Sequence, residues 1–146
     1  MDKPKIIEGG MVVDVRGEIG FVNDFNFKDV KRFYMIKNHK EGFPRAWHGH
    51  KKEAKYVMVL SGSLLIGAVK IDDWEKPSKD LKPERFVLSE HKPSVLYIPA
   101  GYANGFMSLS TNTKAIFYST STLEESLKDD IRYEARYWDI WQVQER

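Results

Sequence analysis

The stretch Tyr56–Ile71 reads YVMVLSGSLLIGAVKI and contains two apolar runs, Tyr56–Leu60 and Leu64–Ile71, on either side of Ser61-Gly62-Ser63. Short apolar runs that are bounded by Gly and Ser are typical of buried β-strands. The glycine between the two runs indicates a tight turn. The stretch therefore predicts a β-hairpin in the middle of the chain.

Similar short runs recur on both sides of this hairpin, separated by Gly, Pro and Asn residues. They cover residues 11–15, 31–37, 85–88, 94–98, 105–109 and 114–119. One segment has a helical pattern: Thr122-Leu123-Glu124-Glu125 matches a T-x-x-E capping box, and good helix formers follow to about Arg132. The spacing predicts an all-β sandwich or barrel with one short C-terminal helix. Aromatic residues at 133, 137, 138 and 141 favour packing over a ligand cage.

Length and composition limit the function classes. A chain of 146 residues is the size of one domain, so residues 1–146 are expected to form a single domain. The net charge, 23 − 21 = +2, is too small to indicate a nucleic-acid partner. The absence of cysteine excludes thiol catalysis and disulfides. No apolar leader follows Met1 and no run of about 18 apolar residues occurs, so we expect no membrane partner and a cytoplasmic location.

The densest polar cluster on an expected strand is Arg45–His50, RAWHGH. Side chains two residues apart on a strand point to the same face, about 6 to 7 Å from each other, so His48 and His50 share a face. Two imidazoles at that spacing can share a metal ion or flank a substrate. The alternative is a pair of solvated surface histidines beside Lys51 and Lys52.

The metal hypothesis can be tested on the sequence. His48, His50 and Gly62 fit the first cupin motif, but Lys55 stands at the position of its glutamate ligand and Asn104 at that of the histidine in the second motif. Glu53 does not restore the spacing, and an ammonium group would repel a divalent cation. We therefore expect no metal and no other cofactor.

Without a metal, these residues suit proton abstraction next to a carbonyl group. A neutral imidazole can take the proton, and the Lys55 ammonium can stabilise the resulting enolate. The alternative for Lys55 is a solvated lysine at the start of a strand.

Four segments, in this order, resemble the nucleotide-sugar branch of the cupins, which comprises the dTDP-4-keto-6-deoxyhexose 3,5-epimerases and the related 3,4-ketoisomerases. They are Asp14–Gly17 (DVRG), Arg45–His48 (RAWH), Leu96–Phe106 (LYIPAGYANGF) and Phe117–Ser119 (FYS). The resemblance implies a cupin jelly roll and a homodimer formed through strand exchange or sheet packing.

The resemblance also implies roles for individual residues. His48 is expected to be the base, Tyr118 the acid that returns a proton from the opposite face, and Lys55 the enolate stabiliser. Arg16 and Arg45 are expected to hold the diphosphate, because a guanidinium group grips phosphate oxygens bidentately. Asn38 and Asn104 are the other expected substrate-binding residues. His50 completes an H-x-H pair that is similar to that of the 3,4-ketoisomerases.

The leading hypothesis is a metal-independent epimerase that inverts C3, or C3 and C5, of a dTDP-linked 4-keto-6-deoxyhexose. Its expected place is deoxysugar biosynthesis for a bacterial surface glycan such as lipopolysaccharide. A 3,4-ketoisomerase acting on the same substrate class is the first alternative. The second, from another class, is a sugar-binding cupin without catalytic activity.

Overall fold

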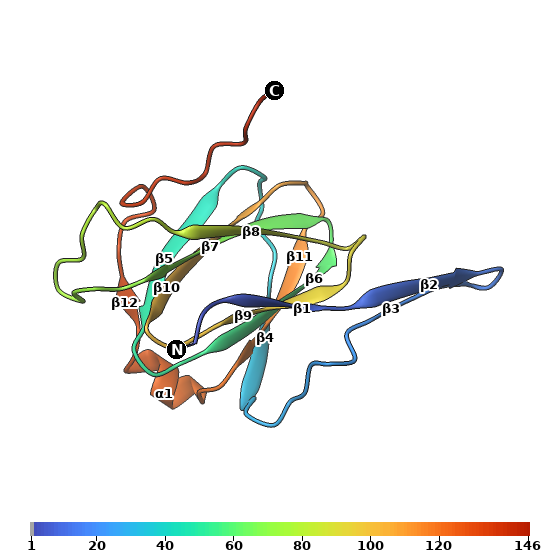
Figure 1. The fold of residues 1–146 in the computed structure, drawn as a ribbon, viewed down its shortest axis with the longest axis horizontal. Coiled ribbons are helices and arrows are strands. Elements are labelled where there is room, and N and C mark those ends of the chain that lie inside the picture. Colours follow the sequence, from blue (N-terminus) through green and yellow to red (C-terminus); the bar gives the residue numbers. More distant parts are fainter. Residues whose placement is uncertain (1) are drawn as a thin grey trace.

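Two five-stranded antiparallel sheets face each other in the computed structural model, which describes residues 2–146 (Figure 1). The first sheet consists, in spatial order, of β1 (Lys5–Glu8), β9 (Ser94–Ile98), β6 (Lys55–Ser61), β11 (Lys114–Ser119) and β4 (Arg32–Ile36). The second consists of β12 (Ile131–Arg132), β5 (Pro44–His50), β10 (Tyr102–Ser108), β7 (Ser63–Lys70) and β8 (Glu84–Ser89). This arrangement confirms the all-β class and is consistent with the expected cupin jelly roll.

Two hydrophobic clusters lie on the two faces of the second sheet. The main core lies between the sheets and includes Val57, Val59, Leu64, Ile66, Leu96, Phe106 and Phe117. The other cluster covers the outer face of the second sheet, where Trp47, Leu65 and Val69 pack against Trp138 and Trp141. The C-terminal aromatic residues therefore serve intramolecular packing, as their pattern predicts.

The predicted hairpin at Tyr56–Ile71 is wrong. β6 pairs with β9 and β11 in the first sheet, whereas β7 pairs with β8 and β10 in the second. Gly62 has φ = +75° and turns the chain from one sheet to the other. Both strands bury apolar side chains in the same core, so their composition does not distinguish a hairpin from a crossing between sheets.

The helix α1 (Leu123–Leu127) is shorter than predicted, although its capping box at Thr122 and Glu125 is present. The chain leaves the helix at Lys128, and residues 131–132 then pair with β5 as β12. Pairing with the sheet therefore replaces the helical continuation that the residue propensities favour. In the described part of the chain, no helix has the length and apolar character needed to cross a membrane.

The strands β2 (Gly10–Asp14) and β3 (Gly17–Phe21) form a separate hairpin that projects from the body of the molecule (Figure 1). Its side chains Val12, Val13 and Ile19 are exposed. Arg16 lies in the turn at its tip, where its guanidinium pairs with Asp14 at 2.6 Å. The hairpin therefore presents apolar side chains that the rest of this chain does not cover.

Candidate active site

A cavity of about 230 Å³ opens between the two sheets, bounded by β4, β5, β6, β10 and the helix α1. Its polar lining comes from Arg32, Tyr34, Arg45, His48, His50, Glu53, Lys55, Asn104, Ser126, Asp130 and Arg132. Ile36, Phe106, Leu123 and Leu127 add apolar surface. The cavity therefore combines bases, cations and an apolar rim.

The wall formed by the second sheet carries both histidines. His48 lies opposite Asn104 in the pairing of β5 with β10, and His50 lies opposite Tyr102. The register shifts between Asn104 and Gly105, because Gly105 pairs with Ala46 and leaves Trp47 without a partner in β10. This bulge brings Arg45, three residues before His48, to the same cavity, although strict alternation would place it on the other face.

The wall formed by the first sheet carries Lys55. Its ammonium group donates a hydrogen bond to the Tyr34 hydroxyl at 2.9 Å. It also lies over the rings of Tyr34 and Phe117, at 5.6 and 5.8 Å from their centroids. Lys55 is buried, so the cavity holds a cation at a defined position that faces the histidine wall.

Both imidazoles are poised as neutral bases. Burial, with additional repulsion from Lys55 and Arg132, lowers the pKa of His48 to about 4, and Asp130 opposes this shift. Burial and Lys55 also lower the pKa of His50, against the opposing effects of the Asp129 carbonyl group and Glu53. A histidine that is neutral at pH 7 can accept a proton from a substrate carbon.

His50, Glu53 and Asp129 form the one cluster of the described residues that has metal-ligand geometry, with ligand atoms within 4.8 Å of one another. The carboxylate oxygens, however, are already occupied. Glu53 accepts hydrogen bonds from Ser119 and Ser126, and Asp129 accepts three backbone N–H groups. These partners suit an internal hydrogen-bond network better than a cation.

Five of the expected site residues line this cavity: His48, His50, Lys55, Arg45 and Asn104. Asn38 is buried next to them and accepts a hydrogen bond from Arg45 at 3.3 Å. Arg16 does not line the cavity, because it lies at the tip of the β2–β3 hairpin, where its side chain is 84% exposed.

The structure does not bring Tyr118 to the cavity. Phe117 fills the core between the sheets, so alternation along β11 turns Tyr118 to the outer face of the first sheet. There its ring packs against Phe25 and Phe27 at centroid distances of 5.4 and 5.3 Å. The expected role of Tyr118 as an acid that faces His48 therefore has no support in the geometry of this chain.

Sequence reasoning missed Tyr34 and the carboxylate of Glu53. Tyr34 lies in the predicted strand 31–37, and its alternation with the exposed Phe33 and Met35 is the signal that could have placed it inside. Glu53 follows His50 by three residues, outside any strand, and no periodicity indicates that it turns inward.

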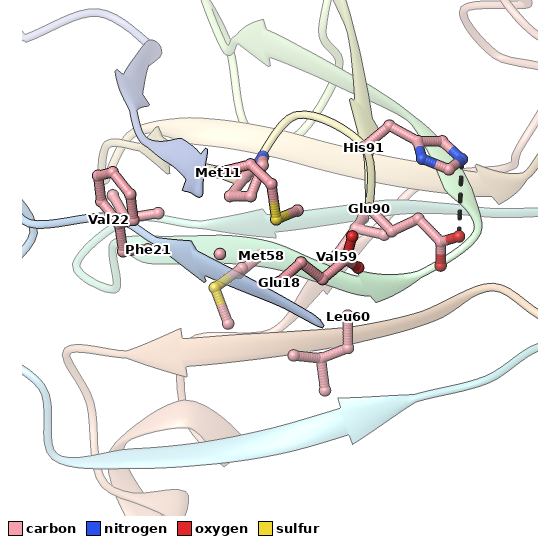
Figure 2. A pocket seen from close by; sticks show the side chains of 11 residues that line it. Met11, Glu18, Phe21, Val22, Met58, Val59, Leu60, Glu90 and His91 are labelled. Carbon is pink, nitrogen blue, oxygen red and sulfur yellow. Dashed lines mark ion pairs between the residues drawn. The ribbon is translucent and has the colours of Figure 1, made fainter. Parts of the chain in front are cut away.

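A larger cavity, of about 530 Å³, lies between the β2–β3 hairpin and the outer side of β6 (Figure 2). Met11, Phe21 and Met58 line it, and Glu90 pairs there with the exposed His91 at 3.6 Å. It lacks the buried bases and the buried cation of the smaller cavity. The chemistry therefore belongs to the cavity between the sheets.

Neutral imidazoles that face an ammonium group inside a jelly roll define an isomerase site, in which a proton next to a carbonyl group is removed and returned. Residues 8–144 match the family model of dTDP-4-dehydrorhamnose 3,5-epimerase. The chain belongs to this family, which confirms the family and the isomerase class that the sequence motifs predict.

Solved structures share the fold. The chain resembles the QdtA 3,4-ketoisomerase from Thermoanaerobacterium thermosaccharolyticum, with a TM-score of 0.68 and 22% identity over 94% of this chain and 93% of that chain. For the WlaRB TDP-quinovose 3,4-ketoisomerase from Campylobacter jejuni, the TM-score is 0.66 and the identity 23%, over 94% and 98% of the chains. For dTDP-4-dehydrorhamnose 3,5-epimerase from Bacillus anthracis, the values are 0.76 and 18%, over 97% and 86%. No curated protein matches the chain in sequence.

Proposed function

We propose that this chain is a 3,4-ketoisomerase that acts on a dTDP-linked 4-keto-6-deoxyhexose. The family supports isomerisation of a keto-deoxysugar, and the QdtA ketoisomerase was solved in complex with TDP and with TDP-4-keto-6-deoxyglucose. Arg45 lines the cavity and offers a guanidinium group to the diphosphate. This proposal departs from the leading hypothesis of the sequence analysis, and the reason is geometric.

The observation that carries the proposal is the position of the two imidazoles. His48 and His50 lie on one wall of the cavity, and Tyr118 lies on the outer face of the sheet that forms the other wall. Moving a ketone from C4 to C3 takes a proton from C3 and delivers one to C4, its neighbour. Two bases on one side of the sugar ring suit this transfer between adjacent carbons.

The groups in the cavity can carry out each proton transfer of this reaction. One imidazole takes the proton from C3, and the electron pair forms a C3–C4 double bond with negative charge on O4. The Lys55 ammonium stabilises this charge, as a preorganised cation does in a water-poor site. A proton then moves from O3 to O4, C4 is protonated by the imidazolium, and the ketone is left at C3.

A second candidate, 3-epimerisation, is favoured by one contact. Tyr34 lies on the wall opposite the histidines, and its hydroxyl accepts the Lys55 hydrogen bond. A tyrosine there could return a proton to C3 from the other face of the sugar. In this alternative Tyr34 takes the role that the family motif suggested for Tyr118.

The experiment is to incubate the purified protein with dTDP-4-keto-6-deoxyglucose in deuterated water and to identify the product by NMR. A 3-keto sugar supports the ketoisomerase, whether C4 carries the proton taken from C3 or deuterium that the imidazolium has exchanged with the solvent. A 4-keto sugar that is inverted and deuterated at C3 would establish the epimerase instead. A substrate that binds, is converted to neither product and takes up no deuterium at any carbon would indicate a sugar-binding protein without catalytic activity.

A homodimer of this single cupin domain belongs to the same proposal. The hairpin side chains Val13 and Ile19 are exposed, and so are Phe33 and Met35 on the outer face of β4. Exposed apolar side chains on the hairpin and on β4 are candidates for contact surfaces, and a second copy would cover them. Exchange of hairpins between subunits would also take Arg16 to a partner. Light scattering should give twice 17.0 kDa; a 17.0 kDa particle at micromolar concentration would contradict the dimer.

Two further parts of the proposal concern the cell. A cytoplasmic location and a role in making deoxysugars for a bacterial surface glycan, such as lipopolysaccharide, stay predictions. Deletion of the gene in its host, followed by analysis of the surface glycan, tests both the product and its destination. Loss of one deoxysugar from the glycan is the expected result, and an unchanged glycan would contradict this role.

A further inference from the structure

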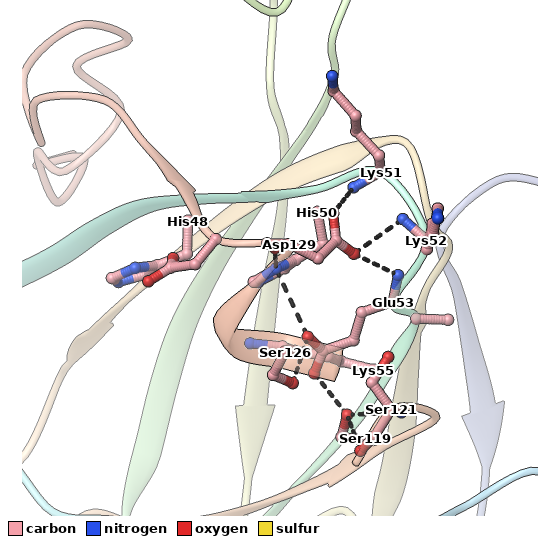
Figure 3. Close-up of polar contacts among 12 residues, drawn as sticks. His48, His50, Lys51, Lys52, Glu53, Lys55, Ser119, Ser121, Ser126 and Asp129 are labelled. Atoms are coloured by element: carbon pink, nitrogen blue, oxygen red, sulfur yellow. Dashed lines mark hydrogen bonds and ion pairs between the residues drawn. The ribbon is translucent and has the colours of Figure 1, made fainter. Parts of the chain in front are cut away.

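A buried carboxylate lies beside the His50 ring (Figure 3). Glu53 is 2% exposed, and its Oε1 lies 3.5 Å from the Nδ1 atom of His50. Ser126 donates a hydrogen bond to Oε1 at 2.8 Å, and Ser119 donates one to Oε2. A carboxylate with a hydroxyl donor on each oxygen is held in one orientation, so its distance to the imidazole is defined.

Asp129 fixes the loop that carries Glu53. Its carboxylate accepts the backbone N–H groups of Lys51, Lys52 and Glu53 at 2.7 to 2.9 Å (Figure 3). Its own backbone oxygen lies 2.6 Å from Nδ1 of His50. Asp129, which follows α1, therefore positions both the His50 imidazole and the Glu53 carboxylate.

These contacts select one form of the His50 ring. A carbonyl oxygen only accepts hydrogen bonds, so Nδ1 carries the hydrogen and Nε2 carries the lone pair. In the part of the chain that the structure describes, Nε2 is buried and has no hydrogen-bond partner. His50 lines the cavity, so this unpaired atom is the one available to a substrate proton.

Charged groups from several elements surround His50. They are Glu53 and Asp129 next to the ring, Lys55 on β6, His48 on the same strand, and Asp130, Arg132, Arg32 and Arg45 around the cavity. Glu53 and Asp129 favour the imidazolium, whereas Lys55 opposes it. Asp130 acts on His48 by its charge, but the His48 ring makes no hydrogen bond to the described residues.

From these contacts we infer that Glu53 is a positioning residue that makes His50 the stronger base of the pair. It holds the Nδ1–H form together with the Asp129 carbonyl group and offsets the positive charge that the ring gains when it takes the proton from C3. The catalytic part of this inference rests on the proposed function. The sequence gives no hint of this role, because Glu53 lies outside any strand and no periodicity indicates that its carboxylate turns toward His50.

The test is the titration of the histidine side chains, followed by ¹⁵N NMR in the free protein. The four histidine signals are assigned from single His→Gln variants. We expect the Nδ1–H form for His50 in the wild type, and a pKa of His50 that is lower by about one unit in Glu53→Gln, because one nearby negative charge is lost. A His50 titration and tautomer that do not change in Glu53→Gln would overturn the inference.

Kinetics provides the second readout. Glu53→Gln should lower kcat by about 10- to 100-fold, a part of what a general base contributes, with little change in KM. The acidic limb of the kcat/KM profile should move to lower pH. Glu53→Asp retains the charge and should recover part of kcat and of the His50 pKa. Ser119→Ala is the matched control, since it removes one hydrogen bond from Glu53 and leaves the charge.

The two readouts separate the two proposals. The titration needs no substrate, so a wild-type protein without isomerase activity overturns the proposed function, while an unmoved His50 signal overturns the role of Glu53. Equal losses of kcat in Glu53→Gln, Glu53→Asp and Ser119→Ala, with no shift of the pH profile, would indicate a structural role and also overturn the inference. Thermal unfolding of each variant confirms that the compared proteins are folded.

Discussion

Neighbouring residues on each strand of the first sheet point to opposite faces, and the two faces have different roles. On the inner face, Tyr34 and Lys55 line the cavity beside Phe117. On the outer face, Phe33 and Tyr118 lie in an aromatic surface. The comparison shows that a tyrosine such as Tyr118, which matches a family motif in sequence, contributes to the site only if the alternation along its strand turns the side chain inward.

The largest expected effect is on the inner side, at the histidine wall. His48→Ala and His50→Ala should each reduce turnover by roughly 10²- to 10⁴-fold, because each removes a group that handles the transferred proton. Turnover of dTDP-4-keto-6-deoxyglucose, followed by NMR, measures both variants. If His50→Ala keeps most of the activity while Tyr118→Phe loses it, the ketoisomerase assignment is wrong.

The second-largest loss of activity is expected for a substitution of Lys55. Lys55→Met keeps the length of the side chain and removes the charge that stabilises the enolate, so kcat should fall by about 10²- to 10³-fold. The binding of dTDP should change much less, because Arg45 remains. The measurement is kcat together with the Kd of dTDP by calorimetry. A loss of dTDP binding with unchanged kcat would assign Lys55 to the nucleotide.

The alternation of side chains along a strand also explains which site residues could be predicted from the sequence. His48 and His50 were correctly placed on one face, because they are two positions apart on a single strand. Lys55 and Asn104 were placed by motif spacing, and the cavity contains both. Tyr118 was misplaced because the motif gives its order in the chain, while the core decides which neighbour, Phe117 or Tyr118, is buried.

The fold class could be predicted from the sequence, but the connections between the strands could not. Short apolar runs indicated most strands, yet β1, β3 and β12 were missed, since none of them has an apolar run of sufficient length. The crossing at Gly62 depends on which strands pair at long range, and local composition carries no information on that. The network around Glu53 likewise forms only when residues 119, 126 and 129 meet the loop after β5.

A smaller effect is expected on stability at low pH. The folded pKa of His48, about 4, is lower than its value of 6.5 in the unfolded chain, so the unfolded state binds the proton more readily. The free energy of unfolding should therefore decrease as the pH falls from 6.5 toward 4. Between pH 7 and pH 5 this contribution is about 1 to 2 kcal/mol.

Urea unfolding of the wild type and His48→Asn at both pH values measures this contribution. The loss between pH 7 and pH 5 should be smaller in the variant. Losses of equal size in the two proteins would show that His48 is not held neutral by its surroundings.

On the outer face the expected effect on activity is close to zero. Tyr118→Phe removes a hydroxyl that does not reach the cavity, so kcat/KM should change by no more than about 2-fold. Tyr34→Phe is the matched variant on the inner face, and it should lose more activity because its hydroxyl contacts Lys55. Equal effects of the two substitutions would remove the distinction between the faces.

Metal removal should have no effect. Lys55 and Asn104 stand at two ligand positions of the metal-binding cupins, and the carboxylates near His50 already have hydrogen-bond partners. Activity after treatment with EDTA and elemental analysis of the purified protein test this. About one Fe, Mn, Ni or Zn ion per chain, with activity lost on chelation, would contradict it.

A crystal structure of the His48→Asn variant with dTDP-4-keto-6-deoxyglucose tests the central claim most directly. The account predicts that the sugar lies between the two sheets, with C3 and C4 facing residues 48 and 50 and with O4 toward Lys55. A sugar bound against Tyr118, or one whose C3 lies away from His50, would contradict it.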